Sequence, residues 1–392
     1  MRILHVITRL DRGGSAENTL LTVAGLPPFF RQSLVFGKTM AFPKLYFELH
    51  GKVEMVEVPE LVRNPSPLKD VLALFQIYRL IRQGRFDLVH THTSKAGILG
   101  RVAARLAGVP RLVHTPHGHI FTGYTGRVLT SFFILLERWA AGFTDRIIGL
   151  TDQEIQDHLE RKIGRPEQFV RIPSGIEVER FEGAHVGAGF KPAPTSAVKV
   201  SLGLPPEAFL IGSVGRLEPI KGPRYLLEAF QALAPRFPHL SLAFVGEGEL
   251  LPELRSYAKS EGLADRVLFL GWRDDVPVLL HAFDLFVLPS LNEGMGRALV
   301  EAMATGLPIV ATRACGIPEV VGEAGLLVEA GNARALADGI EQLLLDPALR
   351  SRLGVMARER ARAYSVEMML LKIEALYREL LEGEQGRRGA KA

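Results

Sequence analysis

The chain has 392 residues, of which 47% are hydrophobic and 23% charged, enough for two cores of about 150–200 residues each. Its single cysteine, Cys315, excludes an internal disulfide and fits a reducing cytoplasm. The net charge of +4 is uneven, because residues 1–180 hold 24 Lys and Arg against 17 Asp and Glu, a net of +7 that leaves −3 for the rest. A basic half faces anionic lipid, an acidic acceptor or nucleic acid, or is simply a solvated surface.

From the apolar segments we expect neither a leader nor a membrane span. Residues 2–8, RILHVIT, are too short for a signal peptide and predict a first buried strand. The longest apolar candidate, residues 128–139, contains four polar residues and falls short of the ~20 residues that cross a bilayer. We therefore expect a cytoplasmic protein, soluble or peripheral on the inner face of the membrane.

Short apolar runs alternate with segments of helical length, in chain order at 3–8, 33–36, 53–58, 87–92, 112–115 and 146–151. The pattern restarts at 210–215, 242–246, 267–271, 285–289, 309–312 and 326–328. Strands without polar alternation, separated by helices, predict an α/β protein with two doubly wound parallel sheets.

The predicted domains are residues 1–180 and 208–363. Between them, residues 181–207 are rich in glycine and proline and predict a linker without a regular element. Residues 364–382 form an amphipathic helix with Val366, Met369, Leu370, Ile373, Tyr377 and Leu380 on one face. A disordered tail is expected at 383–392.

Candidate ligand residues of the first domain follow its strands. Gly13 and Gly14 come after the first strand, where their backbone can approach a phosphate or sugar oxygen, although a tight strand-to-helix turn needs the same residues. Five histidines occupy the ends of two neighbouring strands, at positions 90, 92, 114, 117 and 119. Three imidazoles can ligate zinc, but no carboxylate or cysteine accompanies them locally, so we expect no metal. Local hydrogen bonding is the interpretation for His90 and His114.

In the second domain, Arg216 and Lys221 follow the strand 210–215 and precede a helix. Two cations and a helix N-terminus predict a diphosphate site. Trp272 follows another strand, where it either stacks on a base or anchors packing. Asp274 and Asp275 are predicted to cap the next helix rather than to bind a metal.

Residues 293–301 read EGMGRALVE after the strand 285–289, so two carboxylates flank a glycine turn that opens a helix. The helix is otherwise almost entirely apolar, and Glu301 is therefore expected to be buried and to need a partner. The turn presents Glu293, free backbone N–H groups and Glu301 to one ligand.

Segments 210–222 and 293–301 together resemble the family 4 (group 1) retaining glycosyltransferases of GT-B fold. The resemblance covers nearly the whole chain and is weak only in the linker. The segments beginning at Thr91 and Thr115 are most similar to bacterial capsule and exopolysaccharide members. The resemblance implies two domains facing a cleft, with the C-terminal helix crossing back to the first domain.

What the resemblance implies for function is transfer of a sugar, with retention, from a nucleoside diphosphate sugar to a polysaccharide or lipid-linked acceptor in cell-surface polysaccharide synthesis. His117 would contact the donor sugar near its anomeric carbon, Glu293 the sugar hydroxyls, and Glu301 the ribose. Donor contacts are expected from Gly13, Gly14, Arg216, Lys221, Trp272, Arg273, Glu293, Gly294, Met295, Gly296, Leu299 and Glu301, with His117, Glu293, Arg216 and Lys221 as the catalytic set.

His92 and Lys95 are the expected acceptor contacts, and no metal or other cofactor is expected beyond the nucleotide-sugar substrate. An anionic membrane surface is a further expected partner, met by Arg101, Arg105, Arg111 and Arg127 and by the apolar stretch 128–136, although core packing is the favoured use of that stretch. Nucleic acid is not an expected partner. The alternatives are a nucleotide-sugar epimerase of the same fold and a non-catalytic nucleotide-sugar-binding subunit.

Overall fold

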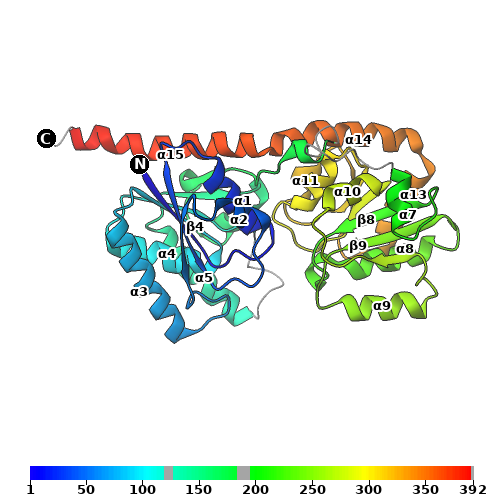
Figure 1. The fold of residues 1–392 in the computed structure, drawn as a ribbon, viewed down its shortest axis with the longest axis horizontal. Coiled ribbons are helices and arrows are strands. Elements are labelled where there is room, and N and C mark those ends of the chain that lie inside the picture. The colour runs from blue at the N-terminus through cyan, green and yellow to red at the C-terminus, as the bar shows by residue number, and fades with distance from the viewer. Residues whose placement is uncertain (119–126, 183–194, 390–392) are drawn as a thin grey trace. The chain divides into compact units, whose positions relative to one another are not determined.

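The computed structural model describes residues 1–118, 127–182 and 195–389, and the chain divides into two compact units (Figure 1). Unit 1 comprises Met1–Gly175 and Val366–Ala392, and unit 2 comprises Ile176–Ser365. Unit 2 is therefore inserted between the two segments that build unit 1. Each unit contains one parallel sheet, so the prediction of two doubly wound domains is confirmed.

The sheet of unit 1 has seven strands in the order β3-β2-β1-β4-β5-β6-β7. Their bounds are β1 Arg2–Ile7, β2 Arg31–Gly37, β3 Glu54–Val58, β4 Leu88–His92, β5 Arg111–Thr115, β6 Arg146–Gly149 and β7 Phe169–Arg171. The first six coincide with predicted runs. The strand β7 was not predicted, because a three-residue edge strand carries no recognisable apolar period.

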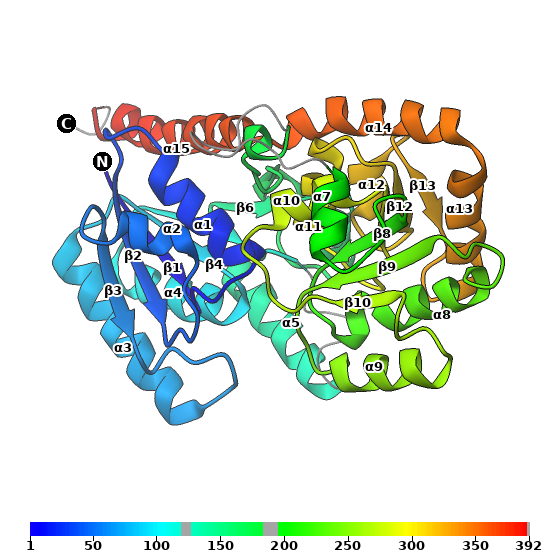
Figure 2. The ribbon, with the colours of Figure 1, turned by 45° about the vertical axis from the view of Figure 1, so that its right-hand side comes forward.

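Helices cover both faces of this sheet (Figure 2). Alternate residues of β1 show the two layers: Leu4 and Val6 pack with α3 (Pro67–Gly84) and α4 (Ser94–Ala107), and Ile3 packs with α1 (Gly14–Gly25) and α15 (Val366–Gly389). The helix α2 (Lys44–Leu49) lies with α1, and α5 (Arg127–Ala141) packs on Ile147 of β6. The helix α6 spans Asp152–Glu160.

The helix α15 packs on unit 1, as predicted. The Arg111 guanidinium donates to the carbonyl of Leu380 at 2.7 Å, and Arg146 pairs with Glu379 at 2.6 Å. Tyr377 is fully buried. The helix continues to Gly389, past residue 383 where the sequence predicts a disordered tail, and residues 390–392 lie outside the described residues.

The sheet of unit 2 has six strands in the order β10-β9-β8-β11-β12-β13. The strands are β8 Phe209–Val214, β9 Leu240–Val245, β10 Val267–Phe269, β11 Leu285–Leu288, β12 Ile309–Thr312 and β13 Leu326–Val328. The helices are α7 Thr195–Ser201, α8 Pro223–Leu233, α9 Leu251–Ser260, α10 Val276–Ala282, α11 Arg297–Ala304, α12 Ile317–Val321, α13 Ala333–Leu345 and α14 Pro347–Ala361. All six strands of this sheet were predicted.

One expectation about the linker is wrong, because α7 lies within residues 181–207. Lys199 of this helix is buried, pairs with Asp284 at 2.7 Å and donates to the carbonyl of Ala208. Contacts with unit 2 stabilise the helix more than its own helix propensity does. The proline and glycine residues around it therefore predicted a linker and not a helix. Among the described residues, no helix is both long and apolar enough to cross a bilayer.

Candidate functional site

The predicted ligand residues lie beyond the carboxyl ends of the strands in both units, where open parallel sheets bind ligands. Among the described residues at these ends, three that are not glycine have positive φ: Thr93 at 63°, His117 at 61° and Cys315 at 44°. Threonine is β-branched and rarely adopts such a conformation. Strained backbone of this kind concentrates at functional sites, so the strand ends are marked by conformation as well as by residue type.

In unit 1, a chain of hydrogen bonds links three histidine rings from three segments. His117 Nε2 lies 2.9 Å from His92 Nδ1, and His92 Nε2 lies 3.0 Å from His5 Nδ1. His5 Nε2 in turn lies 2.9 Å from the side-chain oxygen of Gln32 on β2. His5 and His92 are buried, whereas His117 is half-buried.

His92 is therefore not placed as an acceptor contact. Its side chain is 1% exposed and both of its ring nitrogens are bonded to other histidines. We reassign it to the support of His117. Lys95, the other expected acceptor contact, pairs with Asp70 at 2.5 Å and donates to the carbonyl of Asn64, so its ammonium already joins α4 to α3.

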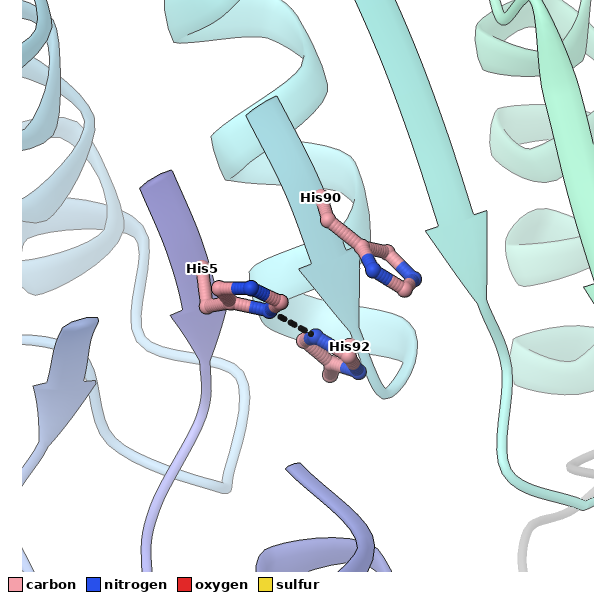
Figure 3. Close-up of side chains that lie close together, drawn as sticks. All are labelled: His5, His90 and His92. Atoms are coloured by element: carbon pink, nitrogen blue, oxygen red, sulfur yellow. Dashed lines mark hydrogen bonds between the residues drawn. The ribbon is translucent and has the colours of Figure 1, made fainter. Parts of the chain in front are cut away.

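His5, His90 and His92 lie side by side on the face of the sheet that α1 and α15 cover (Figure 3). One nitrogen from each ring lies within 4.8 Å of the others, a spacing that a metal ion would accept. These nitrogens already have partners, however, since His90 bonds Tyr377 Oη at 2.6 Å and Thr115 Oγ1 at 2.8 Å. Burial lowers the pKa of all three rings, which keeps them neutral and hydrogen-bonded. Local hydrogen bonding accounts for His90, as expected.

His114 also forms local bonds, with its Nδ1 lying 2.9 Å from Thr91 Oγ1. His119 lies outside the described residues. Gly13 precedes α1 and Gly14 is its first residue, so these glycines occupy the strand-to-helix turn as predicted. Their contact with a donor stays a prediction.

Glu154 of α6 holds the turn that carries His117. One carboxylate oxygen accepts from the N–H of Gly118 at 2.9 Å and the other from the N–H of Leu150 at 2.6 Å. Because the side chain is buried, its pKa rises to about 7. Glu154 was not among the predicted site residues, although an acid three residues after Thr151 is the signature of a helix start.

In unit 2, glycines allow the strand-end loops to approach one another. Gly222 precedes α8 with φ of 65°, and a Cβ there would lie 2.1 Å from the carbonyl oxygen of Pro289 after β11. Gly246 after β9 has φ of 138°, and its Cβ would lie 2.1 Å from the carbonyl oxygen of Gly215. Side chains at either position would push the loops after β8, β9 and β11 apart.

These loops bring Lys221 and Glu293 together. The Lys221 ammonium pairs with the Glu293 carboxylate, and the two side chains are 19% and 17% exposed. Arg216 is more open, 44% exposed, and pairs with Glu218 at 2.6 Å. Each predicted diphosphate cation therefore has a carboxylate partner, which a bound diphosphate would have to replace.

The turn after Glu293 leads into α11 through Gly296, whose φ is 77°. Glu301, 16% exposed, lies 3.9 Å from Arg297 one turn earlier, so the expected partner of this half-buried acid is on its own helix. Met295 and Leu299 are buried, 2% and 0% exposed, and pack the turn against the core. Donor contacts by these residues and by Gly294 stay predictions.

The loop after β10 differs from the prediction. Asp275 stands at the N-cap position of α10, but its side chain makes no capping bond. It forms a bidentate pair with Arg273, at 2.7 and 2.5 Å, which lowers the pKa of the aspartate. Trp272 is 44% exposed and donates to Asp274 at 3.3 Å. Its indole is thus accessible for stacking, whereas Arg273 is already engaged.

Comparison with known proteins identifies the two halves. Residues 5–180 match the model described as Glycosyltransferase Family 4, and residues 195–360 match the model described as Glycosyl transferases group 1. The chain is 40% identical over 265 residues, 67% of each chain, to the UDP-Gal:alpha-D-GlcNAc-diphosphoundecaprenol alpha-1,3-galactosyltransferase of Escherichia coli. It is 33% identical over 312 residues, 75% of this chain and 73% of the other, to the D-inositol 3-phosphate glycosyltransferase of Corynebacterium jeikeium.

Among solved structures, Alr3699/HepE of Anabaena in complex with UDP-glucose superposes with a TM-score of 0.81 at 24% identity, over 97% of this chain and 100% of that one. This likeness establishes the GT-B fold. The matched models and the identity to the Escherichia coli enzyme establish the family. The protein belongs to the family 4, group 1 glycosyltransferases and is an enzyme that uses nucleotide sugars.

Proposed function

We propose that this enzyme transfers a sugar from a UDP-sugar, with retention of configuration, to a lipid-diphosphate-linked acceptor during cell-surface polysaccharide synthesis. The observation that carries the proposal is the Lys221–Glu293 pair at the ends of β8 and β11, beside the N-terminus of α11. The pair offers a cation for the diphosphate and a carboxylate for sugar hydroxyls. Support for the acceptor comes from the Escherichia coli relative, whose name specifies UDP-Gal and a diphosphoundecaprenol acceptor.

The donor assignments follow from this pair. Lys221 and Arg216 would neutralise the diphosphate as the bond to the sugar breaks, and Glu301 would accept the ribose hydroxyls. His117 would contact the transferred sugar. Retention and these individual roles rest on the family resemblance.

We propose further that no metal is needed, since two cations occupy the electrostatic role that a metal has in other nucleotide-sugar enzymes. Activity should survive EDTA. Complete loss in EDTA, with recovery on adding Mg²⁺ or Mn²⁺, would contradict this part of the proposal.

In this proposal the acceptor lies at a membrane surface. Two of the basic residues that were expected to contact lipid are not available for that contact. Arg101 is fully buried and pairs with Glu137 at 2.5 Å, and Arg111 is bonded to α15, so neither is available to lipid. Exposed apolar side chains instead form a stripe on α5, namely Leu129, Phe132, Leu135 and Trp139. A second stripe on α3 comprises Leu68, Val71, Leu72 and Phe75, and the exposed Arg79 lies over the Phe75 ring at 5.9 Å.

These two helices flank α4 on one face of the sheet, so the stripes belong to one layer. The expectation that core packing would use residues 128–136 holds for only one side of α5. An apolar surface with the exposed Arg79 beside it matches the chemistry of an anionic bilayer.

Product analysis tests the function. The purified enzyme is incubated with each of several nucleotide sugars and with a synthetic prenyl-diphosphate-linked sugar, and products are identified by mass spectrometry and by NMR of the anomeric proton. We expect free UDP, an extended acceptor and the donor's anomeric configuration. An isomerised nucleotide sugar would instead indicate an epimerase, and binding without turnover would indicate a non-catalytic subunit.

A further inference from the structure

We propose that Gln32, His5 and His92 position His117 by fixing which of its ring nitrogens carries the proton. This inference deepens the proposed function, because it rests on His117 contacting the donor sugar. The observation that supports the inference is an unbroken series of hydrogen bonds from β2 through β1 and β4 to the turn after β5.

The direction of the series is set at its far end. Gln32 donates through its side-chain nitrogen to the carbonyl oxygen of Phe30 at 3.2 Å, and a carbonyl can only accept. The amide oxygen of Gln32 must therefore face His5. That oxygen also only accepts, so His5 carries its proton on Nε2.

The position of the proton on His5 determines its position on each following ring, because a neutral imidazole has one donor nitrogen and one acceptor nitrogen. His5 Nδ1 accepts, so the proton between His5 and His92 belongs to His92 Nε2. His92 Nδ1 then accepts, so His117 donates through Nε2 and keeps a lone pair on Nδ1. In this tautomer Nδ1 of His117 accepts a hydrogen bond, whereas in the other tautomer it donates one.

Burial keeps the His5 and His92 rings neutral. The pKa of His92 is lowered first by desolvation and then by its coupling to the titratable rings of His90, His117, His5 and His114. His90 also lies beside this series of hydrogen-bonded rings, but its nitrogens bond Thr115 and Tyr377 of α15. His90 is thus equally buried and lies outside the series, which makes it a matched control.

Nitrogen-15 NMR of histidine-labelled protein tests the inference directly. In the wild type we expect protons on Nε2 of His5, His92 and His117. Gln32→Met removes the acceptor at a half-buried position with little risk to folding, and should allow the Nδ1–H tautomer of His117 to appear. His5→Leu should do the same, whereas His90→Gln should leave His117 unchanged.

Kinetics supply the second readout. Loss of one neutral hydrogen bond should reduce kcat about 5- to 10-fold in Gln32→Met and leave UDP affinity unchanged. A wild-type His117 with its proton on Nδ1, or an unaltered tautomer and kcat in Gln32→Met, would overturn the inference. So would near-stoichiometric zinc in the purified protein that His90→Gln removes. If the wild type shows the expected tautomers but transfers no sugar, the proposed function fails and the hydrogen-bond series stands.

Discussion

Under the proposed function, the ion pair between Lys221 and Glu293 would couple two ligand-binding roles. In the structure the ammonium and the carboxylate neutralise each other, so donor binding would have to separate them. A diphosphate would then replace Glu293 as the partner of Lys221, and the Glu293 carboxylate would accept hydroxyls of the sugar. The pair holds both side chains in place before the donor arrives.

Replacing Lys221 with Ala should weaken UDP binding by roughly 10- to 1000-fold, because a charge-assisted contact in a partly buried site is lost. Isothermal titration calorimetry measures this change. Arg236→Ala, which removes an exposed ion pair with Glu341 in the same unit, is the control and should bind UDP normally. Wild-type affinity in Lys221→Ala would refute the diphosphate assignment.

Replacing Glu301 and replacing Glu293 should have different effects, because the two carboxylates are proposed to contact different parts of the donor. Glu301→Gln should lower affinity for free UDP, since the ribose is part of that ligand, and Glu293→Gln should not lower it, because Lys221 loses a competitor. Glu293→Gln should instead reduce turnover of the complete donor. Equal losses of UDP affinity in both variants would contradict these roles.

At the scale of elements, α15 closes the histidine cluster through Tyr377. Tyr377→Phe should destabilise the protein by about 1–3 kcal/mol, because His90 Nδ1 loses its partner in a buried site. The expected fall in melting temperature is roughly 2–10 °C. Tyr78→Phe, a half-buried tyrosine on α3, is the matched substitution and should change it little. Unchanged stability in Tyr377→Phe would mean that the hydroxyl contributes nothing.

The stripe on α5 gives a second element-scale prediction. Phe132→Ser with Trp139→Ser should weaken binding to vesicles of anionic lipid at low salt by at least about tenfold, since two exposed rings lose their apolar contact. Val355→Ser on α14 of unit 2 is the exposed control. Vesicle co-sedimentation measures the difference, and raised salt should release the wild type. Equal binding by both variants would remove α5 from the membrane surface.

Element positions were predictable where one physical signal dominated. Continuous apolar runs located β1 and β12 because buried parallel strands need no polar alternation. The series from Gln32 to His117 was not predictable, because it depends on strand order: β1 lies beside β4, with His5 in register with His90. Likewise Asp275 satisfies the rule for a cap residue, and only the structure shows that Arg273 competes for its carboxylate.

At the scale of the whole molecule, buried histidines should make stability depend on pH. The pKa values of His5 and His158 are lowered to about 4 by burial, so the stability they contribute is complete above pH 6.5 and is lost as pH falls towards 4. Glu154 acts oppositely, since its pKa of about 7 favours the folded state at low pH. The effect of the histidines should exceed that of Glu154, because the pKa values of His90, His92 and His114 are lowered like that of His5.

Thermal unfolding followed by circular dichroism should therefore show a melting temperature that falls by roughly 5–15 °C between pH 7 and pH 5, each lowered histidine contributing about 1.4 kcal/mol per pH unit. His158→Gln keeps a donor to the carbonyl of Glu154 without titrating, and should flatten the slope. A melting temperature that rises on acidification would show that Glu154 dominates.

The return of α15 to unit 1 sets an order for folding during synthesis. Residues 1–175 leave the ribosome first, yet α15, which covers one face of their sheet together with α1, begins at Val366, after all of unit 2. At about 5–20 residues per second this delay is roughly 10–40 s. Unit 2 is continuous in the chain and can complete its core within that interval, so the second domain to be made is the first that can finish. Until then the nascent first domain displays the apolar surface around Ile3, Leu88 and Val113, the surface that a chaperone would have to shield.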